Sequence, residues 1–108
     1  MTYTNLALIE TAVFTKQVGA ILSDEEYRAL QFHLIVRPGA GVVIPGSGGL
    51  RKLRWRLPAQ GKRGGARLIY YWKPTAKRIF LLFLYPKNVR SDLSRSQLRT
   101  MRNLVAGD

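Results

Sequence analysis

The chain has 108 residues, of which 46% are hydrophobic and 22% charged, as expected for one folded domain (1–108) and not for a disordered or membrane-embedded chain. It contains no cysteine and one histidine, which excludes disulfides, thiol chemistry and multi-histidine metal sites. The 18 Lys and Arg residues outnumber the 6 Asp and Glu residues, and the resulting formal charge of +12 indicates an anionic partner.

The charge is unevenly distributed along the chain. Residues 1–50 carry three basic and four acidic side chains, whereas residues 51–108 carry fifteen basic and two acidic ones. We therefore expect the second half to bind nucleic acid, with an acidic protein or a membrane surface as the second choice. The first ten residues lack the cationic start and apolar stretch of a signal peptide, so we expect a cytoplasmic protein with no membrane partner.

The first half predicts one strand and two helices. Residues 5–10 are typical of a short strand, and a weakly amphipathic helix is expected over residues 11–19. A stronger helix follows Ser23, which together with Glu26 forms the capping-box pattern, and it ends before Pro38. Residues 38–49 read as a glycine- and proline-rich connection, which lacks the lysine of a nucleotide-binding Walker loop.

Residues 50–57, "LRKLRWRL", alternate between two kinds of side chain, as an amphipathic strand does. Lys52, Arg54 and Arg56 share one face at spacings of roughly 7 Å. Leu53 and Trp55 share the other face. Three cations without an anion on one strand face indicate contact with a nucleic-acid backbone rather than an ordinary solvated surface.

The stretch "AQGKRGGARLIYYW" (59–72) joins a glycine-rich connection to an aromatic strand over 66–72. Lys62 and Arg63 lie in this connection among three glycines, which leave the backbone free to adapt to a ligand. Arg67 shares a strand face with Tyr71. Tyr70 has two interpretations, because an exposed ring would stack on bases, whereas aromatic residues of a central strand more often belong to the core.

The last third predicts a strand over 78–85, reached through a tight hairpin at 73–77, and a helix over about 95–106 capped by Ser94 and Gln97. Lys87, Asn88 and Arg90 lie between this strand and this helix. The predicted order is strand, two helices, three antiparallel strands and a closing helix. This order describes a small α+β domain.

The residue types limit the chemistry. Without cysteine, paired carboxylates or a second histidine, the usual catalytic triads and dyads are excluded, and we expect neither metal nor cofactor. Lys, Arg, Tyr and Asn side chains suit one reaction, the cleavage of RNA by its own 2′-hydroxyl. There the protein aligns the nucleophile, neutralises the phosphate and transfers protons, and a lysine among other cations has a lowered pKa.

The segments "GGLRKLRW", "GKRGGARLIYYW" and "FLLFLYPKNVRSDLS", in this order of elements, resemble the RelE/HigB superfamily of bacterial toxins, and in particular its HigB branch. The resemblance implies a small, partly mixed, antiparallel twisted sheet with two N-terminal helices packed on one face and a C-terminal helix. It also implies a metal-independent, ribosome-dependent endonuclease that cuts mRNA in the A site of the 70S ribosome. The expected partner is a cognate antitoxin of the helix-turn-helix, DNA-binding kind.

The resemblance also assigns roles by position. Arg67 matches the arginine that contacts the scissile phosphate, Lys52 and Arg54 match the cationic pair of the preceding strand, and Lys87 matches the basic group after the last strand. Asn88 stands where the RelE branch has an arginine, and no tyrosine lies near Ser94, so the general base is unassigned and we hypothesise Lys62 or Lys87. The expected catalytic residues are Arg67, Lys87, Lys62 and Asn88, and the expected RNA-binding residues are Lys52, Arg54, Arg56, Arg63, Arg90 and Tyr70.

Two alternatives remain open from the sequence. The first is a non-catalytic toxin on the same fold that acts on a protein such as gyrase, as the ParE branch does. The second is a plain RNA-binding module that stacks bases on Tyr70 and Tyr71. The basic strand face and the "KRGGAR" segment favour the nuclease.

Overall fold

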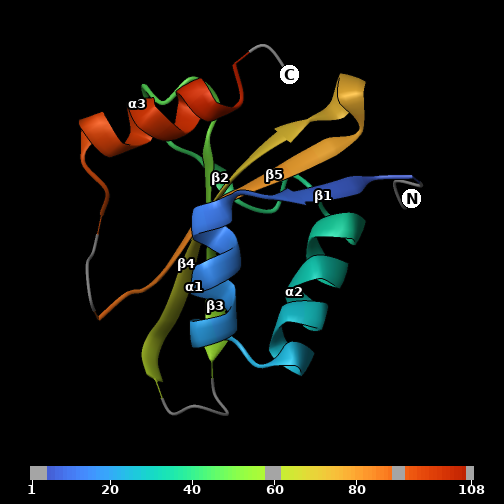
Figure 1. Cartoon of the computed structure of the whole chain (residues 1–108), viewed down its shortest axis with the longest axis vertical. Coiled ribbons are helices and arrows are strands. Elements are labelled where there is room, and N and C mark those ends of the chain that lie inside the picture. Colours follow the sequence, from blue (N-terminus) through green and yellow to red (C-terminus); the bar gives the residue numbers. More distant parts are fainter. Residues whose placement is uncertain (1–4, 58–61, 89–91, 107–108) are drawn as a thin grey trace.

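A computed structural model describes residues 5–57, 62–88 and 92–106, and Figure 1 shows the arrangement of its elements. In chain order these elements are β1 (Ala7–Glu10), α1 (Ala12–Ile21), α2 (Asp24–Val36), β2 (Val42–Val43), β3 (Arg51–Leu57), β4 (Lys62–Lys73), the 3₁₀ turn η2 (Pro74–Ala76), β5 (Arg78–Pro86) and α3 (Arg95–Leu104). The described part contains no helix whose length and apolar character would let it cross a membrane.

The strands form one sheet in the order β1-β5-β4-β3-β2. β1 runs parallel to β5, and the other neighbours are antiparallel, so the sheet is mixed and the predicted α+β class is confirmed. Parallel strands cannot be joined by a two-residue hairpin. The connection from β1 to β5 therefore runs through all the elements from α1 to β4. β5 and β4 therefore lie in the middle of the sheet, with Arg67 on a central strand.

Local capping explains where the helices begin. Ser23 and Glu26 form a complete capping box at α2, and Ser94 and Gln97 form a second one at α3, as their sequence pattern predicts. The Thr11 side chain accepts a hydrogen bond from the Phe14 N–H at the start of α1. Each cap satisfies N–H groups that the first helical turn leaves without an intrahelical partner.

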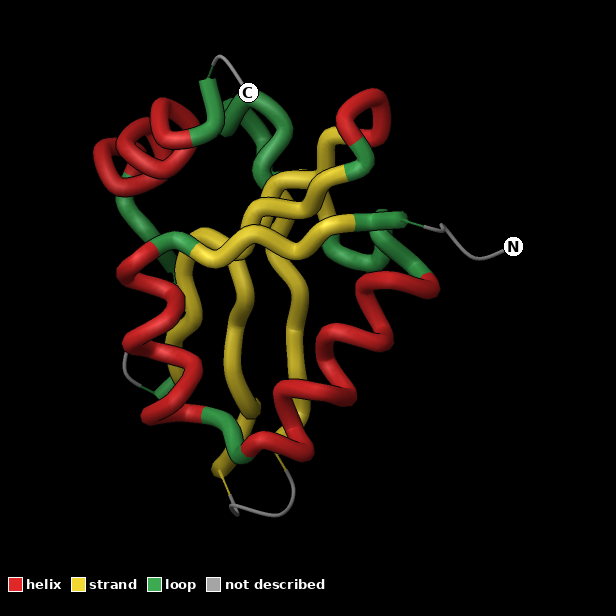
Figure 2. Tube along the Cα trace, turned by 45° about the vertical axis from the view of Figure 1, so that its right-hand side comes forward, coloured by secondary structure: helices red, strands yellow, loops and turns green. Residues whose placement is uncertain are grey.

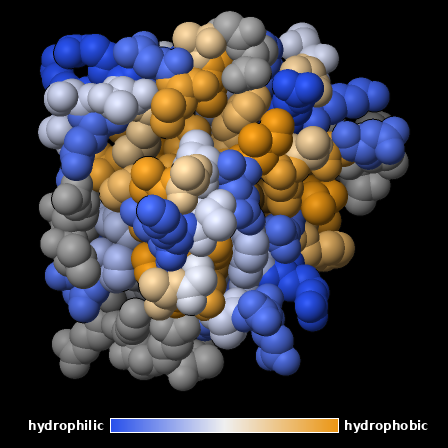
Figure 3. All heavy atoms as spheres, in the orientation of Figure 1, coloured by the Kyte–Doolittle hydropathy of each residue, from blue (hydrophilic) through white to orange (hydrophobic). Residues whose placement is uncertain are grey.

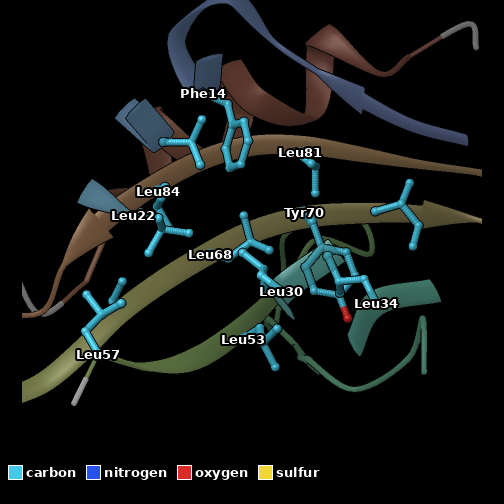
Figure 4. Packing of buried hydrophobic residues seen from close by; sticks show 13 residues of the cluster. Phe14, Leu22, Leu30, Leu34, Leu53, Leu57, Leu68, Tyr70, Leu81 and Leu84 are labelled. Carbon is cyan, nitrogen blue, oxygen red and sulfur yellow. The ribbon is translucent and has the colours of Figure 1, made fainter. Parts of the chain in front are cut away.

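The sheet has two buried faces, each with its own hydrophobic cluster. One face, here called the α1/α2 face, packs Phe14 and Val18 of α1 and Leu30 and Leu34 of α2 against the strands. Figure 2 shows these two helices lying along the same side of the sheet, and Figure 4 shows their side chains meeting those of Leu53, Leu68 and Leu81. The two predicted N-terminal helices thus cover one face, and they leave the opposite face to α3.

The opposite face, here called the α3 face, carries the second cluster. Met101 and Val105 pack with Leu50, Ile69 and Phe80. On α3, Met101 is buried, whereas Leu104 is 56% exposed. α3 therefore packs on one part of this face.

The structure corrects the prediction in two connections. The segment 38–49 contains the short strand β2, which pairs with Arg51 and Lys52 and lies at the edge of the sheet. The glycine-rich connection before Ala66 is shorter than expected, because β4 already begins at Lys62. Gly65 lies inside this strand at a register irregularity, with φ of 62°, a conformation that glycine adopts without strain.

Candidate functional site

The basic residues of β3 lie on the face that the alternating pattern predicts. Leu53 and Leu57 are buried in the α1/α2 cluster with Trp55 packed against it, so Lys52, Arg54 and Arg56, which alternate with them, belong to the α3 face. Arg54 and Arg56 are exposed. β3 thus presents a row of cations on the side of the sheet that α1 and α2 leave open.

Arg67 of β4 joins this row from the neighbouring strand. It lies directly opposite Arg54 in the β3–β4 register and opposite Tyr85 in the β4–β5 register. Residues directly opposite one another share a sheet face, with Cβ atoms roughly 5 Å apart in antiparallel pairs. Arg54 and Arg67 therefore lie on one face, next to each other on neighbouring strands.

Arg67 is much less accessible than the sequence suggested. Only 5% of its surface is exposed, and its Nη1 donates a hydrogen bond to the Ala66 carbonyl oxygen at 3.2 Å. Arg67 therefore contributes positive potential from within the sheet and shows solvent only a small part of its surface.

A cleft of about 420 Å³, here called the Lys52 cleft, adjoins this row. Its floor includes Lys52, Ile69 and Tyr85, and β2 with the following residues to Pro45 forms one wall. The residues Asp92, Leu93 and Leu98, before and in α3, form the other wall. The cleft is thus mostly apolar, with a cation and a phenol at its base, and it lies between the sheet edge and the closing helix.

An acidic residue occupies the mouth of this cleft. The Asp92 carboxylate accepts a hydrogen bond from Lys52 Nζ at 2.9 Å, and the side chains of Lys52 and Asp92 are 30% and 75% exposed. This ion pair neutralises a cation of the proposed RNA-binding row. Within that same part, no three His, Asp or Glu side chains form a group that would hold a metal ion.

The end of β5 lies beside the start of β4. The Lys87 N–H donates to the Gly65 carbonyl oxygen at 3.1 Å, and the side chains of Lys87 and Asn88 are exposed there. The segment "YPKN" thus pairs with β4 through its backbone. The side chains of Lys62 and Arg63, and all of Arg90, lie outside the described part, so their roles stay predictions.

Tyr70 does not belong to this face, and its prediction as a base-stacking residue is wrong. It lies on the α1/α2 face with no exposed surface, and Figure 4 shows its ring among the leucines of the core. Its hydroxyl donates to the Pro38 carbonyl oxygen at 2.7 Å and accepts from the Gly41 N–H at 2.8 Å. Burial is the main cause that raises the pKa of Tyr70 above its usual value, which keeps this donor protonated.

Two residues of the site escape prediction from the sequence. The sequence indicates no partner for Asp92, because nothing local shows that it lies beside Lys52, 40 residues earlier. Tyr85 reads only as part of an apolar strand. Alternation along β5 is the available signal. The neighbouring strand residue belongs to the other face, so Tyr85 lies on the face of Arg67 and opposite it.

The part of the chain that forms this cleft is similar to known proteins. Residues 45–107, which contain β3, β4, β5 and α3, match the family model of the RelE toxin of RelE / RelB toxin-antitoxin systems. The solved structure of an E. coli toxin RelE mutant in the free state, in which two arginines are replaced by alanine, is similar to this chain with a TM-score of 0.61. The match covers 98% of this chain and 99% of that one at 15% identity, so it shows the shared fold.

Proposed function

The chain belongs to the RelE toxin family of toxin-antitoxin systems, and from this premise we propose that it is a ribosome-dependent mRNA endonuclease that a cognate antitoxin neutralises. The proposed substrate is mRNA in the A site of the 70S ribosome. The proposed reaction is the attack of a 2′-hydroxyl on the adjacent phosphate without a metal ion. A helix-turn-helix antitoxin, as in the HigB branch, is the proposed partner.

The observation that carries this proposal is the position of Arg54 directly across from Arg67. Like charges at opposite positions of an antiparallel pair destabilise a sheet. A phosphate bound against both residues removes that penalty and receives hydrogen bonds from two guanidinium groups, which recognise phosphate oxygens in a bidentate manner. The cationic pair therefore favours a phosphodiester ligand over a neutral one.

The proposed roles follow from exposure and position. Arg54, Arg56 and Lys52 hold the RNA backbone along β3, because the first two are exposed and Lys52 lines the cleft with 30% of its side chain exposed. Arg67 stabilises the negative charge that develops on the scissile phosphate. Lys87 or Lys62 transfers the proton, with Asn88 as a neutral donor beside Lys87, and Arg63 and Arg90 add further backbone contacts.

Asp92→Asn is expected to strengthen RNA binding. The substitution releases Lys52 from its 2.9 Å partner, and since a solvent-exposed pair is worth about 0–1 kcal/mol, affinity should rise roughly two- to fivefold at low salt with little change in stability. The measurement is the affinity for a single-stranded oligonucleotide without 2′-hydroxyls. Asp24→Asn, on α2, removes the same charge elsewhere, and equal affinities of the two variants would contradict the proposed role of Lys52.

Induced expression, together with cleavage of mRNA on programmed ribosomes, tests the proposed function itself. Growth arrest with fragmented messages, and cleavage by the purified protein in the presence of chelator, are the expected results. Filamentation with DNA damage and intact messages would instead indicate a ParE-like toxin, and absence of toxicity would indicate an RNA-binding module. Co-purification of a small antitoxin encoded beside the gene would support the proposed partner.

A further inference from the structure

A second cleft, here called the Arg99 cleft, lies between α3 and the loop that follows β2. It has a volume of about 470 Å³. One wall is the loop from Pro45 to Gly48, which leads from β2 into β3, and the other is α3. The residues that line it include Arg95, Arg99 and Arg102 and no carboxylate. The family assignment gives this cleft no role.

The three arginines share one side of α3. They occupy positions i, i+4 and i+7, which place side chains above one another on a helix. Arg95 and Arg99 are exposed, and Figure 3 shows the hydrophilic outer side of α3 at the upper left of the molecule. This clustering of like charges opposes helix formation by a few tenths of a kcal/mol per pair, and a bound anion would offset that repulsion.

The walls of the Arg99 cleft are held in place before any ligand binds. Arg102 Nε donates to the Gly48 carbonyl oxygen at 2.9 Å, and the Arg102 guanidinium lies 4.8 Å from the centre of the Tyr71 ring. On the loop, the buried Ser47 donates its hydroxyl hydrogen bond to the Ile44 carbonyl oxygen at 2.6 Å. Arg102 thus joins α3 to the loop and to β4, and Ser47 closes the loop on itself.

Gly48 shows that this fit is tight. Its φ is 75°, and a Cβ placed there would lie 2.9 Å from Arg102 Nε. The loop therefore lies directly against the Arg102 side chain, in a backbone conformation that favours glycine. Such preorganisation lowers the entropy lost when a ligand binds.

The Arg99 cleft continues the Lys52 cleft. Pro45 and Leu98 line both of them, so the two clefts adjoin. A chain that carries a negative charge on every unit would meet Arg54 and Lys52 on the sheet and then the arginines of α3. An extended phosphodiester backbone has this distribution of charge.

We propose that the Arg99 cleft binds a backbone phosphate of the same RNA strand that occupies the Lys52 cleft. This inference extends the proposed function, and it rests on that function for the identification of the polyanion as RNA. Arginine presents a planar fork of donors that matches phosphate oxygens, and it is the residue favoured for phosphate recognition. The cleft has no aromatic ring among its lining residues, so we expect contact with the backbone and no reading of bases.

The test compares two double variants in binding to a single-stranded DNA, which has no 2′-hydroxyl and cannot be cleaved by this route. Arg95→Ala with Arg99→Ala is expected to weaken binding about tenfold or more and to lower the salt dependence by about 0.7 in log–log slope for each phosphate that the protein no longer neutralises. Lys16→Ala with Arg28→Ala removes the same charge from α1 and α2 and is expected to change affinity less than about twofold.

The length of the bound strand distinguishes a specific site in the Arg99 cleft from general electrostatic attraction. A dinucleotide that fills only the Lys52 cleft should bind the Arg95/Arg99 double variant as it binds the unchanged protein, whereas the longer strand should not. Equal losses of affinity in both double variants, or equal losses for the short and long ligands, would overturn the proposal. A variant that loses binding to poly-glutamate but keeps binding to DNA would also overturn it, in favour of an acidic protein ligand.

Failure of the Arg99 cleft and failure of the proposed nuclease give different results. DNA binding does not require catalysis, so a protein that cleaves no mRNA but needs Arg95 and Arg99 for the longer strand would refute the nuclease and keep the cleft. If the Arg95/Arg99 double variant still cleaved mRNA and bound the longer strand as the unchanged protein does, the nuclease would be kept and the cleft refuted. Both arginines are exposed, and thermal unfolding of the double variant is expected to match that of the unchanged protein.

Discussion

Arg67→Ala is expected to lower mRNA cleavage on programmed ribosomes by about 100- to 1000-fold, as the loss of one preorganised charge-stabilising donor does in other enzymes. The reason lies in its surroundings. Arg67 is held in a central strand and is 5% exposed, so its charge acts through a medium of lower dielectric constant than water and needs no reorganisation during the reaction. The measurement is the single-turnover rate with saturating ribosomes.

Three controls keep this result interpretable. Thermal unfolding shows whether the loss of a buried side chain disturbs the fold. Arg67→Lys keeps the charge without the planar fork, and we expect it to restore only part of the rate. Arg28→Ala, on the exposed surface of α2, should cleave at the normal rate. A folded Arg67→Ala or Arg67→Lys protein with the full rate would show that this arginine does not act on the scissile phosphate.

Gly65→Ala is expected to destabilise the protein by about 3 kcal/mol or more, because the backbone itself blocks the new methyl group. An added Cβ would lie 2.0 Å from the Trp55 carbonyl oxygen and 2.9 Å from its carbonyl carbon, and φ at this position is 62°. No side-chain movement relieves a contact with main-chain atoms of the neighbouring strand. The measurement is urea-induced unfolding.

Gly19→Ala is the matched control. Gly19 lies within α1, and nothing lies within 4 Å of a Cβ added there. Alanine is the better helix former, so this variant should be more stable by roughly 0.5–1 kcal/mol. If Gly65→Ala unfolded within about 1 kcal/mol of the unchanged protein, the strand irregularity at this position would not need glycine.

The parts of the fold that depend on local chemistry could be predicted from the sequence. The capping boxes at Ser23 and Ser94 need only residues within one helical turn, and the faces of β3 follow from strict alternation between Leu53, Trp55 and the cations. The common face of Lys52, Arg54 and Arg56 was predictable for the same reason, whereas the position of Arg67 opposite Arg54 depends on the register of two strands.

The remaining features depend on contacts between distant segments. Burial of Tyr70 requires carbonyl and amide partners at Pro38 and Gly41, about 30 positions earlier, and the strand pattern alone carries no information about them. The surroundings of Gly65 predict a loop, because glycine next to Lys62 and Arg63 is typical of a turn. Its conformation is instead imposed by the register of β3 and β4, which local sequence does not specify.

The parallel pairing of β1 with β5 has a consequence for how the protein is made. The Thr11 hydroxyl, just after β1, donates to the Leu82 carbonyl oxygen of β5, 71 residues later in the chain. During synthesis the first strand leaves the ribosome long before its partner exists, so the sheet is completed only when the last quarter of the chain has emerged. Until then the apolar side of α1 is unburied, and the cationic surface acquires its central strands only at the end of translation.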